Sequence, residues 1–157
     1  MTTVATVSLT TEAVPVQDQH RFDEARLALY MREHLNDFTP PLHVAQIHGG
    51  MSNPTFILTD GSGRRYVLRK KPPGVLLPSA HAVDREFRVQ SALRATGVPV
   101  ANMRVLCEDP AVIGTAFYIM DFVVGRVLRT YTLPDMAPAE RRAIYTAMID
   151  VLAKLHT

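Results

Sequence analysis

The pattern of apolar and polar residues divides the first half of the chain into one helix and three strands. Apolar residues recur at helical spacing after Asp23, which predicts a helix that Asp23 caps and that runs to about Leu35. Three shorter segments then alternate between apolar and polar residues. They predict strands at residues 42–48, 55–59 and 66–71. The turn sequence Asp60-Gly61-Ser62-Gly63 should join the second and third strands as an antiparallel hairpin.

The second half repeats this alternation of helix and strand. Ser79 is a plausible cap for a helix at residues 80–95, which Thr96-Gly97 closes. Two further strands are predicted at residues 103–108 and 115–123. A long helix opens at Pro138, and its apolar stripe needs a surface to cover it. The stripe consists of Ile144, Tyr145, Met148, Val151, Leu152 and Leu155.

This order of elements predicts an α+β fold with a five-stranded antiparallel sheet, one packed helix and an N-terminal helix. Residues 1–19 show no sustained period and are expected to form a flexible leader. Residues 20–125 should form the main unit. Residues 126–157 would be a crossing segment and the first helix of a further, helical part.

A pair of glycines lies between the first two predicted strands, in the sequence His48-Gly49-Gly50-Met51-Ser52-Asn53. Glycine lets backbone N–H groups approach an anion, and Ser52 and Asn53 can add donors. The segment can therefore be a loop folded over phosphates. The alternative is an ordinary hairpin, because short glycine motifs often have no ligand.

The third strand and the next helix supply a cation and a carboxylate. Strand alternation puts Arg69 on one face with Val67 and puts Lys70 on the other. Glu86 falls within an apolar stripe of Ala82, Val89 and Leu93, so a buried pair with Arg69 is predicted. Alternatively, Glu86 lies at the edge of the stripe and reaches solvent, and a bulge could exchange Arg69 and Lys70.

Composition narrows the class of protein. The 157 residues are 47% hydrophobic and 20% charged, with a net charge of +2, which is typical of a globular domain and not of a polycation. The single Cys107 excludes an internal disulfide and is expected to be a buried structural thiol. No signal peptide is evident, and the longest apolar run, residues 111–120, is too short to span a membrane, so a cytoplasmic location is the default.

Nucleic-acid and metal binding are not favoured. The basic residues near the third strand have no interleaved aromatic residues, and ordinary solvation explains them, so no nucleic-acid partner is expected. The six histidines show no metal-ligand spacing.

Several stretches together resemble a known family. They are residues 49–56, which begin with Gly49-Gly50-Met51-Ser52-Asn53, and residues 66–74, 77–87, 96–100, 113–120 and 152–156. In this order they resemble the small lobe of the protein-kinase-like fold, and more closely the aminoglycoside phosphotransferase and choline kinase family. The resemblance is greatest to the subgroup that occurs alone in bacteria or fused ahead of acyl-CoA dehydrogenases.

The resemblance implies an ATP site. Gly49, Gly50, Ser52 and Asn53 would cover the nucleotide phosphates, and Val67 would be among the nucleotide-binding residues. Arg69 falls where such kinases usually place a lysine, with Glu86 as its helix partner. The arginine is a departure that changes the geometry of phosphate binding. The hinge that meets adenine would consist of Met120, Asp121, Phe122 and Val123.

The resemblance also implies which parts lie elsewhere. The family's catalytic aspartate and asparagine, and its Mg²⁺ ligands, are expected beyond Thr157, and Asp121-Phe122-Val123 is interpreted as hinge. By family, the enzyme transfers the γ-phosphoryl group of ATP to a hydroxyl of a small molecule, either an aminoglycoside, a choline-like alcohol or a hydroxyacyl compound. The segment alone is expected to bind nucleotide without turnover. The alternative is a non-catalytic nucleotide- or partner-binding module. In either case a C-terminal lobe or a protein partner would cover the helix at residues 138–156.

Overall fold

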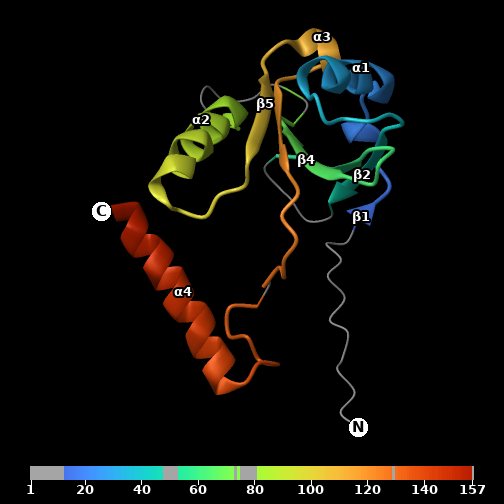
Figure 1. Ribbon diagram of the computed structural model, residues 1–157. Coiled ribbons are helices and arrows are strands. Elements are labelled where there is room, and N and C mark those ends of the chain that lie inside the picture. The colour runs from blue at the N-terminus through green and yellow to red at the C-terminus, as the bar shows by residue number, and fades with distance from the viewer. Residues whose placement is uncertain (1–12, 48–52, 73, 75–80, 129, 157) are drawn as a thin grey trace.

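The computed structural model describes residues 13–47, 53–72, 74, 81–128 and 130–156. Within them, six strands form one antiparallel sheet in the order β1-β2-β3-β4-β6-β5 (Figure 1). The strands are β1 Ala13–Val14, β2 His43–Ile47, β3 Thr55–Thr59, β4 Arg65–Lys70, β5 Met103–Cys107 and β6 Phe117–Asp121.

The sheet has the five expected strands and one more. The additional strand, β1, pairs with β2 through Ala13↔Ile47 and Val14↔Gln46. It lies within the range expected to be a flexible leader, and residues 13 and 14 of that range belong to the sheet instead. Residues 1–12 lie outside the described part of the chain.

Four α-helices accompany the sheet in the described ranges: α1 Glu24–His34, α2 Val83–Leu93, α3 Pro110–Ile113 and α4 Pro138–His156. The predicted cap of α1 is confirmed, since the Asp23 carboxylate accepts a hydrogen bond from the backbone N–H of Arg26. The expected cap of α2, Ser79, lies outside the described residues. The short α3 was not predicted; Asp109 caps it and Gly114, with φ of 86°, ends it.

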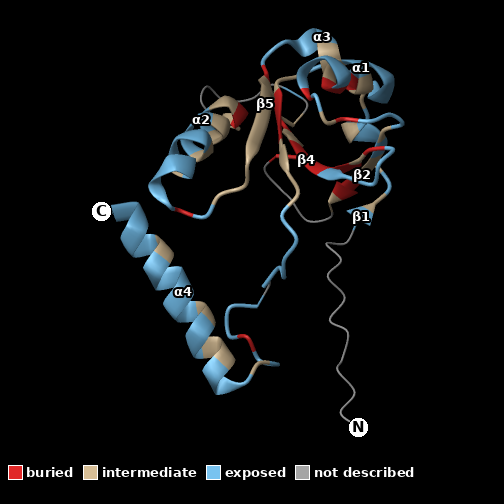
Figure 2. Ribbon diagram, viewed as in Figure 1, coloured by how far each residue is buried: buried red, intermediate tan, exposed pale blue. Residues whose placement is uncertain are grey.

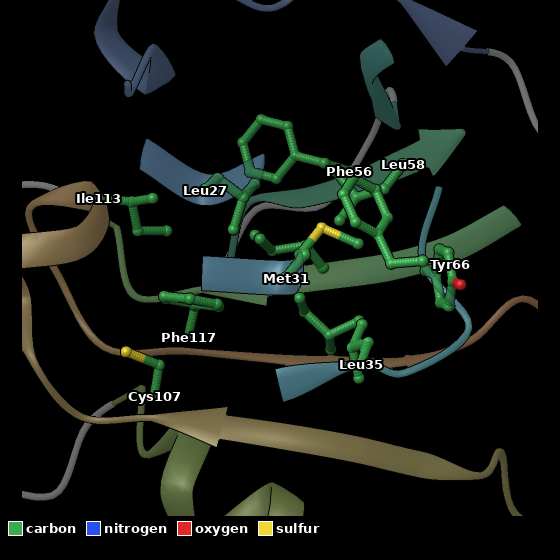
Figure 3. Close-up of a cluster of buried hydrophobic side chains, with 12 residues drawn as sticks. Leu27, Met31, Leu35, Phe56, Leu58, Tyr66, Cys107, Ile113 and Phe117 are labelled. Carbon is green, nitrogen blue, oxygen red and sulfur yellow. The ribbon is translucent and has the colours of Figure 1, made fainter. Parts of the chain in front are cut away.

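The main core lies between α1 and one face of the sheet. Leu27 and Met31 of α1 are fully buried against side chains of β3, β4 and β6. Figure 3 shows these side chains pointing toward one another, with Cys107 at the edge of the cluster. Cys107 is a buried free thiol, as predicted. The cluster contains Leu27, Met31, Leu35, Phe38, Phe56, Leu58, Tyr66, Leu68, Cys107, Ile113, Phe117 and Ile119.

Helix α2 covers part of the opposite face, beside β5 and β6 (Figure 1). The predicted stripe was wrong at Val89, which is 51% exposed. The helix is rotated so that Val83 is buried and the ring of Phe87 lies 6.2 Å from that of Tyr118 on β6. Glu86 remains on the side that faces the sheet.

The turn between β3 and β4 is closed by the buried carboxylate of Asp60. It accepts hydrogen bonds from the backbone N–H groups of Ser62, Arg64 and Thr39 and from the Ser62 hydroxyl. Burial alone would raise the pKa of Asp60, but these hydrogen bonds outweigh it and lower the pKa. Gly61 is required because a Cβ there would lie 2.3 Å from the carbonyl oxygen of Pro40.

Helix α4 has no buried residue among those described, and Figure 2 shows it mostly exposed, with some segments of intermediate burial. An apolar groove on it is lined by Ile144, Ala147, Met148, Val151, Leu152 and Leu155. No described helix is both long enough and apolar enough to cross a bilayer.

Truncating Leu68 should destabilise the fold far more than truncating Leu29. Leu68 is fully buried, so Leu68→Ala loses apolar burial and leaves a cavity, at a cost of about 2–5 kcal/mol. Leu29 is 51% exposed on α1, so Leu29→Ala should change stability by less than about 0.5 kcal/mol. Denaturant unfolding of both variants measures the difference, and equal losses would contradict this assignment of the core.

Candidate functional site

Arg69 and Lys70 lie on opposite faces of β4, as strand alternation predicts. The pairing of β4 with β3 and with β6 is continuous, with Arg69 opposite Thr55 and Tyr118, so no bulge exchanges the two cations. Arg69 therefore lies on the same face as α2. Lys70 faces α1.

Lys70 is only 5% exposed, and its ammonium lies 5.4 Å from the ring centre of Phe22 and 5.8 Å from that of Phe56. Within the described residues no carboxylate lies within ion-pair distance of it. Burial lowers the pKa of Lys70 accordingly. The Lys70 side chain points away from the face on which Arg69 and Glu86 meet, so Lys70 takes no part in that pair.

Arg69 and Glu86 form the predicted pair, but the pair is not fully buried. The Nε of Arg69 lies 3.2 Å from Oε2 of Glu86, and the two side chains are 34% and 33% exposed. The Nε–H is not aligned for a hydrogen bond with the carboxylate. The contact is therefore an electrostatic one, and water screens it in part.

Two other side chains donate the hydrogen bonds that Glu86 accepts. Nδ2 of Asn53 lies 3.1 Å from Oε1, and the hydroxyl of Tyr118 lies 3.0 Å from Oε2. His81 extends the network, because its Nδ1 lies 2.9 Å from Oδ1 of Asn53. The carboxylate is thus satisfied without either terminal nitrogen of Arg69.

Tyr118 is the best-buried member of this network. Burial is the largest cause that raises its pKa to about 12, and the charge and hydrogen bond of Glu86 add to it. Arg69 opposes the shift. The neutral hydroxyl is therefore held as a donor to Glu86.

The expected loop over the phosphates is described only at its end. Gly49, Gly50 and Ser52 lie outside the described residues. Asn53 is buried, and its side chain is directed to Glu86 and His81. Contact of these four residues with a nucleotide stays a prediction.

Val67 and Met120 provide an apolar patch beside Arg69. They are register partners on β4 and β6, and alternation puts them on the same face as Arg69 and Tyr118. A flat, apolar group such as an adenine ring can lie against such a surface. Their predicted role in nucleotide binding is untested.

Among Asp121, Phe122 and Val123 of the expected hinge, only Val123 has a backbone N–H without a backbone partner in the part of the chain that the structure describes. The N–H of Asp121 donates to the carbonyl of Asn102 at 2.9 Å, and that of Phe122 donates to the carbonyl of Arg65 at 3.3 Å. Val123 has no such partner there and is 68% exposed. Val123 is therefore the hinge residue best placed to donate to an adenine edge.

The side chains of Asp121 and Phe122 are engaged in holding the hinge. The Asp121 carboxylate accepts from Nδ2 of Asn102 at 2.8 Å and lies 3.5 Å from Arg104. The guanidinium of Arg65 lies 4.0 Å above the centre of the Phe122 ring.

Across the described ranges, no three His, Cys, Asp or Glu side chains gather as a metal site.

Sequence reasoning missed Tyr118 and His81. Tyr118 could have been found, because a residue opposite Arg69 in an antiparallel pair shares its face. His81 carried no such signal. Its position depends on a backbone φ of 57°, which no periodic pattern of apolar and polar residues predicts.

Replacing Tyr118 with phenylalanine should remove part of the pH dependence of stability. The folded-state pKa of about 12 exceeds the ordinary 10.0, so the hydroxyl stabilises the fold below pH 10 and this contribution is lost as the pH rises towards 12. We expect Tyr118→Phe to be about 1–2 kcal/mol less stable than the parent at pH 8, with the gap narrowing above pH 10.

Denaturant unfolding at a series of pH values measures this gap. Tyr131→Phe is the control, since Tyr131 is 85% exposed and its replacement should open no gap. A gap for Tyr118→Phe that stays constant to pH 12 would show that the pKa of Tyr118 is not raised in the folded state.

Comparison with solved structures finds a chain of similar fold. It is the crystal structure of a "putative aminoglycoside phosphotransferase" from Ralstonia eutropha, with 51% identity and a TM-score of 0.73. The match covers 87% of this chain and 38% of that one. The α+β arrangement of a protein-kinase-like small lobe is therefore shown, with six strands where five were expected.

Curated relatives include acyl-CoA dehydrogenase family member 11 of rat and of human. The rat protein is 46% identical over 96% of this chain and 20% of its own length. The human protein is 50% identical over 90% of this chain and 19% of its own length. The chain thus spans about a fifth of the length of these relatives. The model of the phosphotransferase enzyme family matches residues 43–157, and the chain belongs to that family.

Proposed function

We propose that this chain binds ATP and forms the nucleotide-binding part of a phosphotransferase that moves the γ-phosphoryl group to a hydroxyl of a small molecule. The observation that carries the proposal is that different side chains supply the hydrogen bonds and the positive charge that Glu86 contacts. Asn53 and Tyr118 donate the hydrogen bonds to the carboxylate, and Arg69 contributes only its charge and its Nε. Among the described residues, no hydrogen bond engages the two terminal nitrogens of Arg69, which leaves them available to an anion.

Phosphate is the anion that suits this arrangement. A guanidinium offers two parallel N–H donors to phosphate oxygens, and such charge-assisted bonds are stronger than neutral ones. Glu86 would hold the arginine in place from the other side. In the sequence, Gly49 and Gly50 shortly precede β3, the strand whose Thr55 is the register partner of Arg69.

The adenine ring would lie against Val67 and Met120 and accept a hydrogen bond from the N–H of Val123. In this arrangement the apolar patch supports the ring, and Arg69 and the loop hold the phosphates. The described chain supplies these binding groups but no residue that we assign to proton transfer. We propose that the catalytic aspartate and asparagine, and the ligands of Mg²⁺, belong to the part of the family's proteins that this chain does not cover.

The acceptor is proposed to be a hydroxyacyl compound. The solved relative is named for aminoglycosides, whereas the curated relatives are named for acyl-CoA dehydrogenases, and these span the chain at 46% and 50% identity. A choline-like alcohol is the remaining candidate of the family. ATP supply makes the cytoplasm the proposed location.

The apolar face of α4 supports a second candidate, a module that binds nucleotide and docks on a partner protein without catalysis. We favour the enzyme, in which the C-terminal lobe of the same phosphotransferase covers this face. Phosphate transfer from ATP to a hydroxyacyl compound by the full-length protein tests the choice. Nucleotide binding without any transfer would favour the module.

Arg69→Met should weaken the binding of ATP much more than that of adenosine. The substitution removes the charge that faces the phosphates and keeps an unbranched side chain beside the apolar patch. We expect a loss of roughly tenfold or more for ATP and less than about twofold for adenosine, as measured by calorimetry. Arg88→Met is the matched control, because Arg88 lies on α2 with its side chain 66% exposed, and it should leave both affinities unchanged. Equal losses for ATP and adenosine would refute phosphate binding by Arg69.

Glu86→Ala should also weaken ATP binding, by about 1–2 kcal/mol or roughly tenfold. A fully buried pair would predict about 3–5 kcal/mol, but each side chain of this pair is about one-third exposed, so the expected cost is smaller. The control is Asp84→Ala, which removes a carboxylate of the same helix that lies 4.0 Å from Arg88. Unchanged ATP affinity in Glu86→Ala would mean that the pair does not position Arg69 for the nucleotide.

A further inference from the structure

His81 lies two residues before the first residue of α2, at the point where the chain turns into the helix. Its backbone has φ of 57°, in the left-handed region, and its carbonyl accepts a hydrogen bond from the N–H of Val83. The side chain reaches across to Asn53, with Nδ1 2.9 Å from Oδ1. It thereby links the start of α2 to the end of the glycine loop.

The chemistry of Glu86 determines which atom of this link carries the proton. An ionised carboxylate can only accept, so Asn53 must present Nδ2 to Oε1 of Glu86. Oδ1 of Asn53 then faces His81, and an amide oxygen can only accept as well. Nδ1 of His81 must therefore be the donor. In the neutral imidazole this leaves Nε2 without a proton.

We propose that His81 is a positioning residue for the nucleotide site, acting through Asn53 as the neutral Nδ1–H tautomer. By donating to Asn53, His81 fixes the amide in the one orientation that can bind Glu86. Asn53 and helix α2 are then joined, so that Asn53, Arg69 and Glu86 keep one arrangement. This inference rests on the proposed function, because positioning has a consequence only if nucleotide binds there.

Substitution of His81 by Asn and by Asp tests the hydrogen-bond donor at Nδ1 apart from the rest of the side chain. Asn and Asp both tolerate a positive φ, so neither should strain the backbone at position 81. The Nδ2 of asparagine can take the place of the donating Nδ1. Aspartate has nearly the same shape but can only accept, and it would face Oδ1 of Asn53 with a second acceptor.

The first measurement needs no nucleotide. The full chain is labelled with ¹⁵N-histidine, and the His81 ring is assigned by the signals that disappear in His81→Asn. Long-range ¹H–¹⁵N spectra are recorded at about pH 8.5, well above the usual histidine pKa of about 6.5. We expect a protonated Nδ1 and an unprotonated Nε2. A protonated Nε2, or rapid averaging of the two tautomers, would overturn the proposal.

The second measurement is the affinity for ATP of the parent and both variants. We expect His81→Asn to bind within about twofold of the parent and His81→Asp to lose roughly tenfold, as for the loss of one partly buried hydrogen bond. Binding is measured at about 0.5 M salt, where the added charge of the aspartate is largely screened. Unfolding midpoints of the two variants are compared to exclude a loss of the fold.

The outcomes distinguish this inference from the proposed function. The expected tautomer together with rescue by asparagine supports the positioning role. Equal ATP affinity in all three proteins overturns it, even if the tautomer is as expected. Failure of the parent to bind ATP overturns the proposed function and, with it, any role of His81 in nucleotide binding, whereas the spectra would still report the hydrogen bond itself.

Discussion

The site depends on how the carboxylate of Glu86 is satisfied. A carboxylate at an interface between helix and sheet is costly unless donors reach it, and here each oxygen has its own: Asn53 for Oε1 and Tyr118 for Oε2. These donors come from the segment before β3 and from β6, while Glu86 itself belongs to α2. One carboxylate therefore ties three separate elements together. Helix α2 has one buried residue, Val83, among its eleven, so this polar network is an important part of its attachment.

Strand β4 imposes a second constraint, because it serves both faces of the sheet. Lys70 is buried toward α1, beside the rings of Phe22 and Phe56, and Arg69 points toward α2. A slip of one residue would exchange the two faces and put the longer, forked cation into the core. Burial of Lys70 without a carboxylate in the described chain is unfavourable. Apolar residues of β3 and β6, which pair with β4 on its two sides, hold the strand in this register.

The sequence was sufficient where local rules decide the outcome. Alternation predicted the faces of Arg69 and Lys70, and helical spacing brought Glu86 to the sheet. The sequence was insufficient where contacts between distant segments determine the structure. Strand β1 is two residues long and exists because β2 offers it an edge, and Val89 is exposed because packing, rather than its own stripe, sets the rotation of α2. The role of His81 likewise depends on a backbone angle and on Asn53, which lies 28 residues away.

The arginine at position 69 follows from this arrangement. A lysine has one nitrogen, which would have to contact Glu86 and a phosphate at the same point. Arginine has three nitrogens in a rigid plane, so Nε can face the carboxylate while the other two face outward. Because Asn53 and Tyr118 already satisfy that carboxylate, Glu86 does not need an aligned hydrogen bond from Nε. The same two donors thus reduce the need for a tight ion pair, and within the described ranges no hydrogen bond engages the guanidinium fork, as the proposed phosphate contact requires. In this geometry the departure from lysine is compatible with nucleotide binding.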